Sequence, residues 1–382
     1  MRCFKNKVLL AAVFFVLTAL IGCSKPEEKA AVPVVNVACN LPMTGPFGIY
    51  GQTVRDGALL AIDDLKNRKT NVKINMDIQD NAGKPGTTAS IMQKQFLGPV
   101  DIYVSGVKPQ TMAIFDEVAK KGVPHFVWVF DAFICAQNQN TFRTWVSFKF
   151  EPVKYLQYID YKKPGKIAIA YPQLPHVDEE FTKIVIPKLL ERGYSRDDIF
   201  VEVFEWDQKD FKNVMAKIKE FGPDLTILSG FQGNIAAMIK LAKSYNMVHD
   251  GNFIGTYDTM DAATVLSSKE IEGIRLVAPS YSLDEKNAPL DAWKDRFRAK
   301  YNREPLYTDA YSYDMVQIIA DAASRVKPPS ASSQEWSNAL AATNIDGVTG
   351  KLSFDKDGDL EVSLVIGVFK DGKILLDESD SQ

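Results

Sequence analysis

Strand-like and helix-like patterns of hydrophobic residues alternate along most of this chain. Residues 34–40 alternate between apolar and smaller or polar side chains, which predicts a strand. A Pro/Gly turn cluster follows at residues 41–46, and from Tyr50 apolar residues recur at helical spacing. Gly57, beside the apolar face, is expected to let this helix lie close against a sheet. A strand, a loop and a helix form half of a parallel βαβ unit, and such units bind ligands beyond their strand ends.

The same alternation continues up to about residue 130. Further strands are predicted at residues 73–78, 102–104 and 123–130, and helical patterns separate them. The last of these strands is continuously apolar, which is typical of a parallel strand buried on both faces. This alternation indicates an open parallel sheet with helices on its faces.

A second unit of similar size follows, with helical patterns between its strands. Its strands are predicted at residues 166–171, 199–204, 225–228 and 253–255. After them come a strand at 274–278, helices at 292–301 and 310–326, and a closing hairpin around Asp371-Gly372. The pattern therefore predicts an α/β protein with two doubly wound parallel-sheet lobes.

The N-terminus is expected to lie outside both lobes. Arg2, Lys5 and Lys7 precede an uncharged, mostly apolar run at residues 8–22, which is too short for a membrane-spanning helix and indicates a signal peptide. The run ends in Leu-Ile-Gly-Cys23, which resembles the lipobox of bacterial lipoproteins.

That resemblance implies a signal peptide over residues 1–23 and acylation of Cys23, whereas the alternative is an ordinary signal peptide with an incidental cysteine. Residues 24–33 are polar and rich in Ala, Pro, Glu and Lys, which predicts a tether. We expect an exported protein that is lipid-anchored to the membrane and faces the periplasm or the cell exterior.

Composition and charge exclude several functions. The 382 residues carry a net charge of −3 and are 46% hydrophobic, so they offer no electrostatic footprint for nucleic acid. The three histidines are scattered, and no nucleophile elbow, phosphate loop or dinucleotide fingerprint is present. We therefore expect no enzyme, no cofactor and no metal. Residues 355–359 superficially resemble a calcium loop, but a solvated turn is favoured because the bidentate Glu is missing.

Two cysteines remain once Cys3 is removed with the signal peptide and Cys23 is acylated. Cys39 lies in the first predicted strand and Cys135 follows a later one. Two buried thiols are favoured, although an exported protein could also pair them.

Residues 34–65 resemble the opening of type I periplasmic solute-binding proteins, the leucine/isoleucine/valine-binding family of ABC importers. The similarity lies in the strand, in the loop Thr44-Gly-Pro-x-x-x-x-Gly51 and in a helix that ends AIDDL. Residues 350–359, GKLSFDKDGD, are similar to that family's last crossing between lobes and the turn after it. The resemblance covers essentially the whole mature chain.

The resemblance implies a three-segment hinge between the lobes. Its crossings would fall near residues 144–148, 277–282 and 347–352. The first lobe would comprise residues 34–146 plus 280–349, and the second residues 149–278 plus 352–382.

The function implied is that of an extracytoplasmic substrate-binding lipoprotein, which captures a small solute by hinge closure. Its partners would be the solute, an ABC permease and, through the lipid anchor, the membrane; a monomer is expected. A sensory module of a signalling receptor with the same fold is the alternative, and the sequence does not separate the two. A lipid-anchored hydrolase would need a nucleophile–base pair that we cannot assemble.

The family's ligand contacts come from strand ends and helix starts of both lobes. The residues at matching places are Tyr50, Lys108, Gln110, Phe130, Asp131, His176, Phe231, Tyr257 and Asp258.

Most of these residues also have a structural explanation. Tyr50 and Phe130 would also serve as packing residues, and Lys108 as a solvated loop charge. Asp131 would also start a turn, and Asp258 would also cap the helix that follows it.

The amino-acid clamp of the family is not intact in this sequence. Pro109 has no N–H to donate to a carboxylate, and Asp131 stands where a threonine is expected. Tyr257 occupies the place of the acid that binds the ligand's ammonium. With Phe130 and Phe231, and with Phe133 as a further candidate, it would form an aromatic wall. A small aromatic or amide-bearing solute is therefore an alternative to branched-chain amino acids.

Overall fold

The computed structural model describes most of the chain beyond the N-terminal segment, namely residues 32–68, 71–131, 133–147, 149–284, 287–326, 328 and 331–381. The predicted signal peptide, Cys23 and the tether up to residue 31 lie outside this part and stay predictions. Among the helices of the described part, none combines the length and the apolar character that a membrane span requires.

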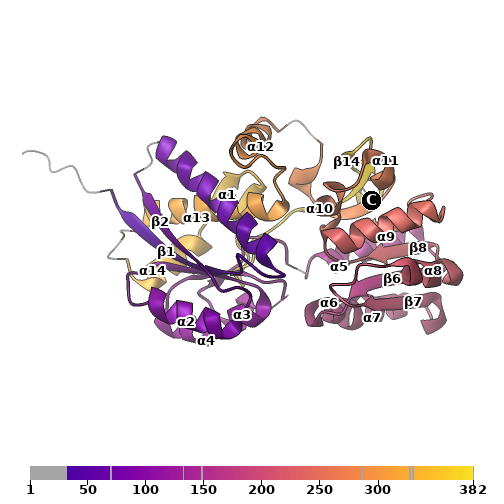
Figure 1. The fold of residues 1–382 in the computed structure, drawn as a ribbon, viewed down its shortest axis with the longest axis horizontal. Coiled ribbons are helices and arrows are strands. Elements are labelled where there is room, and N and C mark those ends of the chain that lie inside the picture. Colours follow the sequence, from indigo (N-terminus) through magenta and orange to yellow (C-terminus); the bar gives the residue numbers. More distant parts are fainter. Residues whose placement is uncertain are drawn as a thin grey trace, which may run out of the picture. The chain divides into compact units, whose positions relative to one another are not determined.

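The first sheet, as far as the structure describes the chain, has five parallel strands in the order β2-β1-β3-β4-β5. They are β1 Val34–Leu41, β2 Lys73–Asp80, β3 Ile102–Gly106, β4 His125–Trp128 and β5 Thr141–Phe142. Figure 1 shows α1 (Gly48–Asn67) and α13 (Tyr307–Arg325) over one face of this sheet. The other face carries α2 (Pro85–Gln95), α3 (Lys108–Met112) and α4 (Phe115–Lys121).

The second sheet has seven described strands in the order β14-β13-β10-β9-β8-β6-β7. Five of them are parallel, namely β6 Ile167–Pro172, β7 Ile199–Phe204, β8 Leu225–Leu228, β9 Phe253–Gly255 and β10 Arg275–Pro279. The antiparallel hairpin of β13 (Leu364–Lys370) and β14 (Lys373–Leu376) completes it, turning at Asp371-Gly372 as predicted.

Helices cover both faces of the second sheet. They are α5 Glu151–Lys162, α6 Pro175–Glu179, α7 Ile186–Glu191, α8 Lys212–Phe221, α9 Gln232–Ser244, α10 Thr259–Ala263 and α11 Ser268–Ile271. Strand β6 shows why, because Ile167 and Ile169 pack into the core that contains α5 and α7, whereas Ala168 and Ala170 pack against α8 and α9. Both faces of the strand are therefore apolar, and only helices on both sides can bury them.

Each sheet reverses its strand order at its own first strand, so the two reversals are at equivalent positions. In the first sheet β1 lies between β2 and β3, and in the second β6 lies between β7 and β8. At such a point the loops after the two central strands diverge to opposite faces and leave a crevice at the carboxyl edge. Each sheet therefore offers one crevice, and the chain segments that line them are the loops after β1, β3, β6 and β8.

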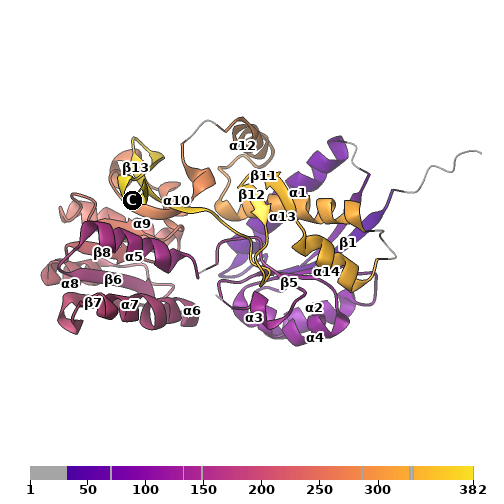
Figure 2. The same cartoon turned by 180° about the vertical axis from the view of Figure 1, so that it is seen from behind.

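The chain passes between the two sheets more than once. It leaves the first sheet after β5, returns after β10 to form α12 (Ala288–Tyr301), α13 and α14 (Ser333–Ala341), and enters the second again at β13. Figure 2 shows the two-stranded ribbon of β11 (Asn344–Gly347) and β12 (Gly350–Ser353) beside α13. We call the parts built on the first and second sheets the first and second lobe. Their exact boundaries stay a prediction.

Several local expectations are corrected. The strand predicted at 123–130 extends only over 125–128, and the helix predicted from residue 310 starts at Tyr307. Gly57 faces α13 and not the sheet, because a Cβ there would lie 2.0 Å from the carbonyl oxygen of Asp309. Cys39 and Cys135 are both buried and free, as favoured.

Candidate functional site

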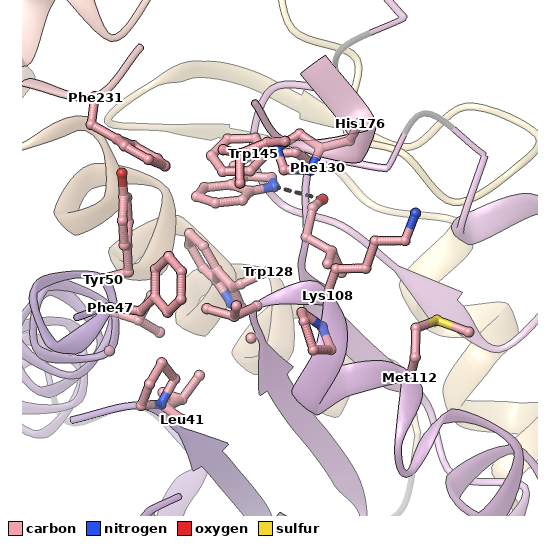
Figure 3. Close-up of a pocket in the computed structure, with 18 of the residues that line it drawn as sticks. Leu41, Phe47, Tyr50, Lys108, Met112, Trp128, Phe130, Trp145, His176 and Phe231 are labelled. Atoms are coloured by element: carbon pink, nitrogen blue, oxygen red, sulfur yellow. Dashed lines mark hydrogen bonds between the residues drawn. The ribbon is translucent and has the colours of Figure 1, made fainter. Parts of the chain in front are cut away.

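A cavity of about 420 Å³ lies at the carboxyl edges of both sheets, within the size range of small-molecule sites. Its wall contains the residues that follow β1, β3 and β4 in the first lobe and β6 and β8 in the second. Figure 3 shows the aromatic side chains that surround it, which are Phe47, Tyr50, Trp128, Phe130, Trp145 and Phe231. The cavity therefore occupies the place that the strand order of both sheets predicts.

Phe130 is the centre of an aromatic stack on the cavity wall. Its ring lies 4.5 Å from the ring of Trp145 on one side and 5.5 Å from that of His176 on the other. Trp145 is held in turn by Trp128, at 5.1 Å, and by its indole N–H, which donates to the carbonyl oxygen of Val129 at 3.3 Å (Figure 3). Ring pairs of this kind are stabilising beyond the area they bury, so the wall is preformed.

Aromatic pairs also join the two lobes around the cavity. Tyr50 meets Phe231 edge to face, with ring centroids 6.2 Å apart. Phe47 stacks on Trp206, which follows β7, at 5.5 Å. In both pairs one ring comes from each lobe, so separation of the lobes would expose these rings and the cavity together.

One ion pair stands at the rim of this apolar cavity. The Nζ atom of Lys108 lies 2.6 Å from a carboxylate oxygen of Asp131. Burial by itself would raise the pKa of Asp131, but hydrogen bonds from Lys108 and the Phe133 amide, with the charges of Lys108 and Arg143, lower it overall. Asp131 is therefore ionised at neutral pH, and the pair leaves the rim with no net charge.

His176 contributes a neutral polar group to the wall. Burial, followed by the nearby charge of Lys108, lowers its pKa to about 4. At neutral pH the imidazole therefore carries one N–H donor and one acceptor nitrogen and no charge.

A buried hydrogen-bond chain fixes the loop that carries Lys108. The His125 ring nitrogen Nε2 lies 2.8 Å from Ser105 Oγ, which lies 2.9 Å from Thr111 Oγ1 in α3. Val107 precedes α3 with a φ of 68°, which is rare for a β-branched residue. Its N–H donates to Trp128 and its carbonyl accepts from Thr111, so the strained backbone is pinned at both ends.

Five of the nine residues predicted as ligand contacts lie on the cavity wall, namely Tyr50, Lys108, Phe130, His176 and Phe231. Asp131 reaches the site through its ion pair with Lys108. Gln110 is buried behind the wall, where its side-chain N–H donates to the carbonyl oxygen of Gly83. Whether any of them contacts a ligand stays a prediction.

Tyr257 and Asp258 are buried in the second lobe and do not line the cavity. Asp258 occupies the N-cap position of α10, as predicted, but its side chain makes no capping hydrogen bond; its carboxylate instead accepts from the hydroxyl of Tyr307 at 3.2 Å. Burial raises the pKa of Asp258 to about 7. Further carboxylates are buried nearby, among them Glu151 and Glu180, and neither oxygen of Glu180 has a hydrogen-bond partner among the described residues.

Sequence reasoning missed much of the wall. Trp128 and Trp145 look like core residues in the sequence. Their only signal of a ligand site is position, because Trp128 is the last residue of β4 and Trp145 follows β5. Phe47 lies in the Pro/Gly loop after β1, which was recognised as a site loop, so it was the residue most accessible to prediction. Phe133, expected as a possible wall residue, is 66% exposed and off the wall.

Within the described part of the chain, His, Cys, Asp and Glu side chains form no group of three that could hold a metal ion. The described residues of the cavity wall offer apolar and aromatic surface, the hydroxyl of Tyr50, one paired cation and one neutral imidazole.

Known proteins share the sequence pattern and the fold of this chain. The family model described as periplasmic binding protein matches residues 34–373. The leucine-, isoleucine-, valine-, threonine- and alanine-binding protein of Pseudomonas aeruginosa is 24% identical over 351 residues, which span 87% of this chain and 88% of that protein.

Two solved structures illustrate the range of proteins with this fold. A solute-binding protein of an ABC transporter from Rhodopseudomonas palustris, in complex with 3,4-dihydroxybenzoic acid, has a TM-score of 0.77 at 18% identity and covers 89% of this chain and 95% of its own. A branched-chain amino acid transporter substrate-binding protein from Streptococcus pneumoniae, in complex with isoleucine, has a TM-score of 0.72 at 21% identity and covers 89% and 97%. At these identities the likeness shows the fold alone.

Proposed function

This chain belongs to the periplasmic binding protein family, and we propose that its cavity captures a small aromatic carboxylic acid for uptake by an ABC importer. The matched relatives and structures are solute-binding proteins of transporters, which confirms the prediction that the chain is not an enzyme. The proposal concerns which solute is bound and where it is delivered.

The observation that carries the proposal is the contrast between the wall and the rim. Aromatic rings surround the cavity, and the one lysine among the described residues of its wall, Lys108, lies at the rim beside Asp131. An aromatic ring would pack among the aromatic side chains of the wall and lose its contact with water, which supplies affinity in proportion to the apolar area buried. Its carboxylate would then meet the ammonium of Lys108 and the N–H of neutral His176.

A free amino acid fits this wall less well. Its ammonium needs an acceptor, but no Asp or Glu is among the described residues of the wall. Asp131 is already paired with Lys108, and Asp258 is buried against Tyr307. The relative from Pseudomonas aeruginosa is named for amino acids, whereas the Rhodopseudomonas palustris structure holds an aromatic acid. The cavity of this chain favours the second kind of solute.

Binding and release would follow from the lobes closing around the solute. Contacts across the lobes, Phe47 with Trp206 and Tyr50 with Phe231, would stabilise the closed state once the cavity is filled. The closed state is the form that a permease would recognise. We further propose that the mature protein is exported and held at the membrane through acylated Cys23, because acyl chains contribute about 0.8 kcal/mol per buried CH₂.

The test is a thermal-shift series on the chain from Ser24 onward, which lacks the predicted signal peptide and the predicted acylation site. Benzoate and 3,4-dihydroxybenzoate should raise the melting temperature by a few degrees at a hundredfold excess over Kd. Cyclohexanecarboxylate is the control for a similar size and charge without an aromatic ring, and leucine and isoleucine test the amino-acid alternative. A shift with leucine or isoleucine and none with the benzoates would overturn the proposal.

A further inference from the structure

Arg143 is fully buried, and its guanidinium joins three segments of the chain. Its Nη1 donates to the carbonyl oxygens of Val129, at 2.7 Å, and Asp131, at 2.6 Å. Its Nη2 donates to Ser147 Oγ at 2.7 Å. Nε and Nη2 lie 2.7 and 2.6 Å from one carboxylate oxygen of Asp359. All five N–H donors of the side chain therefore face an acceptor.

The three segments have different places in the molecule. Val129 and Asp131 flank Phe130, so the first segment is the cavity wall itself. Ser147 lies between β5 and α5, where the chain leaves the first sheet for the second. Asp359 lies between β12 and β13, where the chain enters the second sheet again. Arg143 thus bonds the wall to two of the connections between the lobes.

The contact with the third segment involves the backbone as well. The Arg143 amide donates to the carbonyl oxygen of Gly358 at 2.9 Å, and its own carbonyl accepts from the Leu360 amide at 2.9 Å. Lys149 joins the same two connections a second time, because its Nζ lies 2.7 Å from Asp355 and 2.6 Å from Asp359. Lys149 makes no hydrogen bond to the wall among those the described residues form.

Burial of such a network is costly, and stability alone does not explain it. Removing ions from water carries a large free-energy cost, and apolar replacements of buried ion pairs are often equally stable. The planar fork of arginine bonds several acceptors at fixed relative positions, which a lysine cannot do. The side chain therefore fixes the geometry between the wall and the two connections.

We infer that Arg143 is a positioning residue that couples closure of the lobes to the position of the Phe130 ring and the Asp131–Lys108 ion pair. A rotation of the lobes bends the connections between them. Because Arg143 holds both connections and the carbonyls on either side of Phe130, the wall moves with the bend. The solute contact and the hinge then form one two-state element. The role of this coupling in solute capture rests on the proposed function. The contacts from which we infer it do not depend on which solute is bound.

Hydrogen exchange tests the coupling without any ligand. The Val107 amide, bonded to the carbonyl of Trp128, reports the wall, and the Leu360 amide reports the connection. In Arg143→Lys, exchange at both should accelerate together, by about tenfold if one charged hydrogen bond is lost. Lys149→Met is the matched control, which should accelerate hydrogen exchange at the Leu360 amide and leave exchange at the Val107 amide unchanged. Arg303→Lys, which disrupts an ion pair with Asp56 and Asp309 elsewhere in the first lobe, should change neither.

If Arg143→Lys accelerates hydrogen exchange at the Leu360 amide but not at the Val107 amide, the proposed coupling is overturned. Arg143 would then only join the two interlobe connections to each other. If Arg143→Lys does not fold, Asp359→Asn keeps the hydrogen-bond acceptor and removes the charge, and it should give the same pattern more weakly. In a second arm, benzoate should protect both amides in the unmodified protein and Val107 alone in Arg143→Lys. Failure of benzoate to bind the unmodified protein would reject the proposed solute, while the ligand-free comparison still decides the coupling.

Discussion

The ammonium of Lys108 lies 2.6 Å from the carboxylate of Asp131, at the rim of a cavity whose other walls are almost entirely apolar and aromatic. This ion pair places two opposite charges within reach of a solute and neutralises both. A carboxylate solute must therefore compete with Asp131 for Lys108, whereas a cationic solute must compete with Lys108 for Asp131.

Substitution of the two members of this ion pair should change the affinity for benzoate in opposite directions. Asp131→Asn should strengthen the binding of benzoate several-fold, because Lys108 is released, and Lys108→Met should weaken it by about tenfold, as loss of a charged hydrogen bond does. Isothermal titration calorimetry measures both, and benzamide is the uncharged control that should respond to neither. If both variants weaken benzoate equally, Asp131 holds Lys108 in position for the solute, and its proposed competing role is wrong.

The stack of Phe47 on Trp206 predicts a kinetic effect. Trp206 is outside the cavity wall but pairs with a wall residue of the other lobe at 5.5 Å. Trp206→Ala should raise the dissociation rate of a bound solute by about three- to tenfold, with little change in the association rate. Stopped-flow displacement measures this. Phe200→Leu is the control, since Phe200 stacks on Phe221 within the second lobe at 5.4 Å. Equal dissociation rates in both variants would contradict a closing role for Trp206.

Glu180 should make the protein less stable as the pH rises. Burial, followed by the charge of Asp258, raises its pKa well above the usual 4.5. The folded state then binds more protons than the unfolded state above pH 4.5, so the free energy of unfolding falls as the pH increases toward the folded-state pKa.

Glu180→Gln should therefore raise the melting temperature at pH 8, and the gain should shrink as the pH falls below 4.5, where Glu180 of the unmodified protein is largely protonated in both the folded and the unfolded state. Thermal unfolding across this range checks the sign. Glu179→Gln, an exposed neighbour, should show no such trend. A stabilisation by Glu180→Gln that did not depend on pH would reject the electrostatic explanation.

Gly57 should respond to alanine against the usual trend for helices. Within a helix, Gly→Ala normally stabilises by up to about 1 kcal/mol. At Gly57 a Cβ would lie 2.0 Å from Asp309 O and 2.2 Å from Ser312 Oγ in α13. Gly57→Ala should therefore destabilise by about 1–3 kcal/mol. Gly233 in α9 has no atom within 4 Å of such a Cβ, so Gly233→Ala should be neutral or stabilising. Denaturant unfolding of the pair decides this.

The alternation of strands and helices was predictable because the central parallel strands are apolar on both faces and the covering helices are apolar on one. The places of Lys108, Phe130 and His176 followed from strand ends, which the pattern also marks. What the pattern does not contain is the direction of a side chain after the strand has ended. Tyr257 and Asp258 follow β9 directly, yet both are buried in the second lobe and not on the wall.

Arg143 shows a second limit. A single charge inside the apolar run Thr-Phe-Arg-Thr-Trp-Val is a visible signal of a buried ion pair. Its partner Asp359 lies 216 residues away, in a turn whose acidic residues were interpreted as solvated. Sequence spacing alone does not bring the two together, because their meeting depends on the return of the chain between the lobes.

Trp206 has one more consequence, which is optical. It is the one tryptophan of the five that follows a strand of the second sheet, and its ring stacks on a phenylalanine of the other lobe. When the lobes part, this indole passes from an aromatic surface into water, and its emission shifts to longer wavelength. Under the proposed closure, the molecule would therefore carry an intrinsic fluorophore at its closing edge, and the emission wavelength of Trp206 would report solute occupancy without any attached dye.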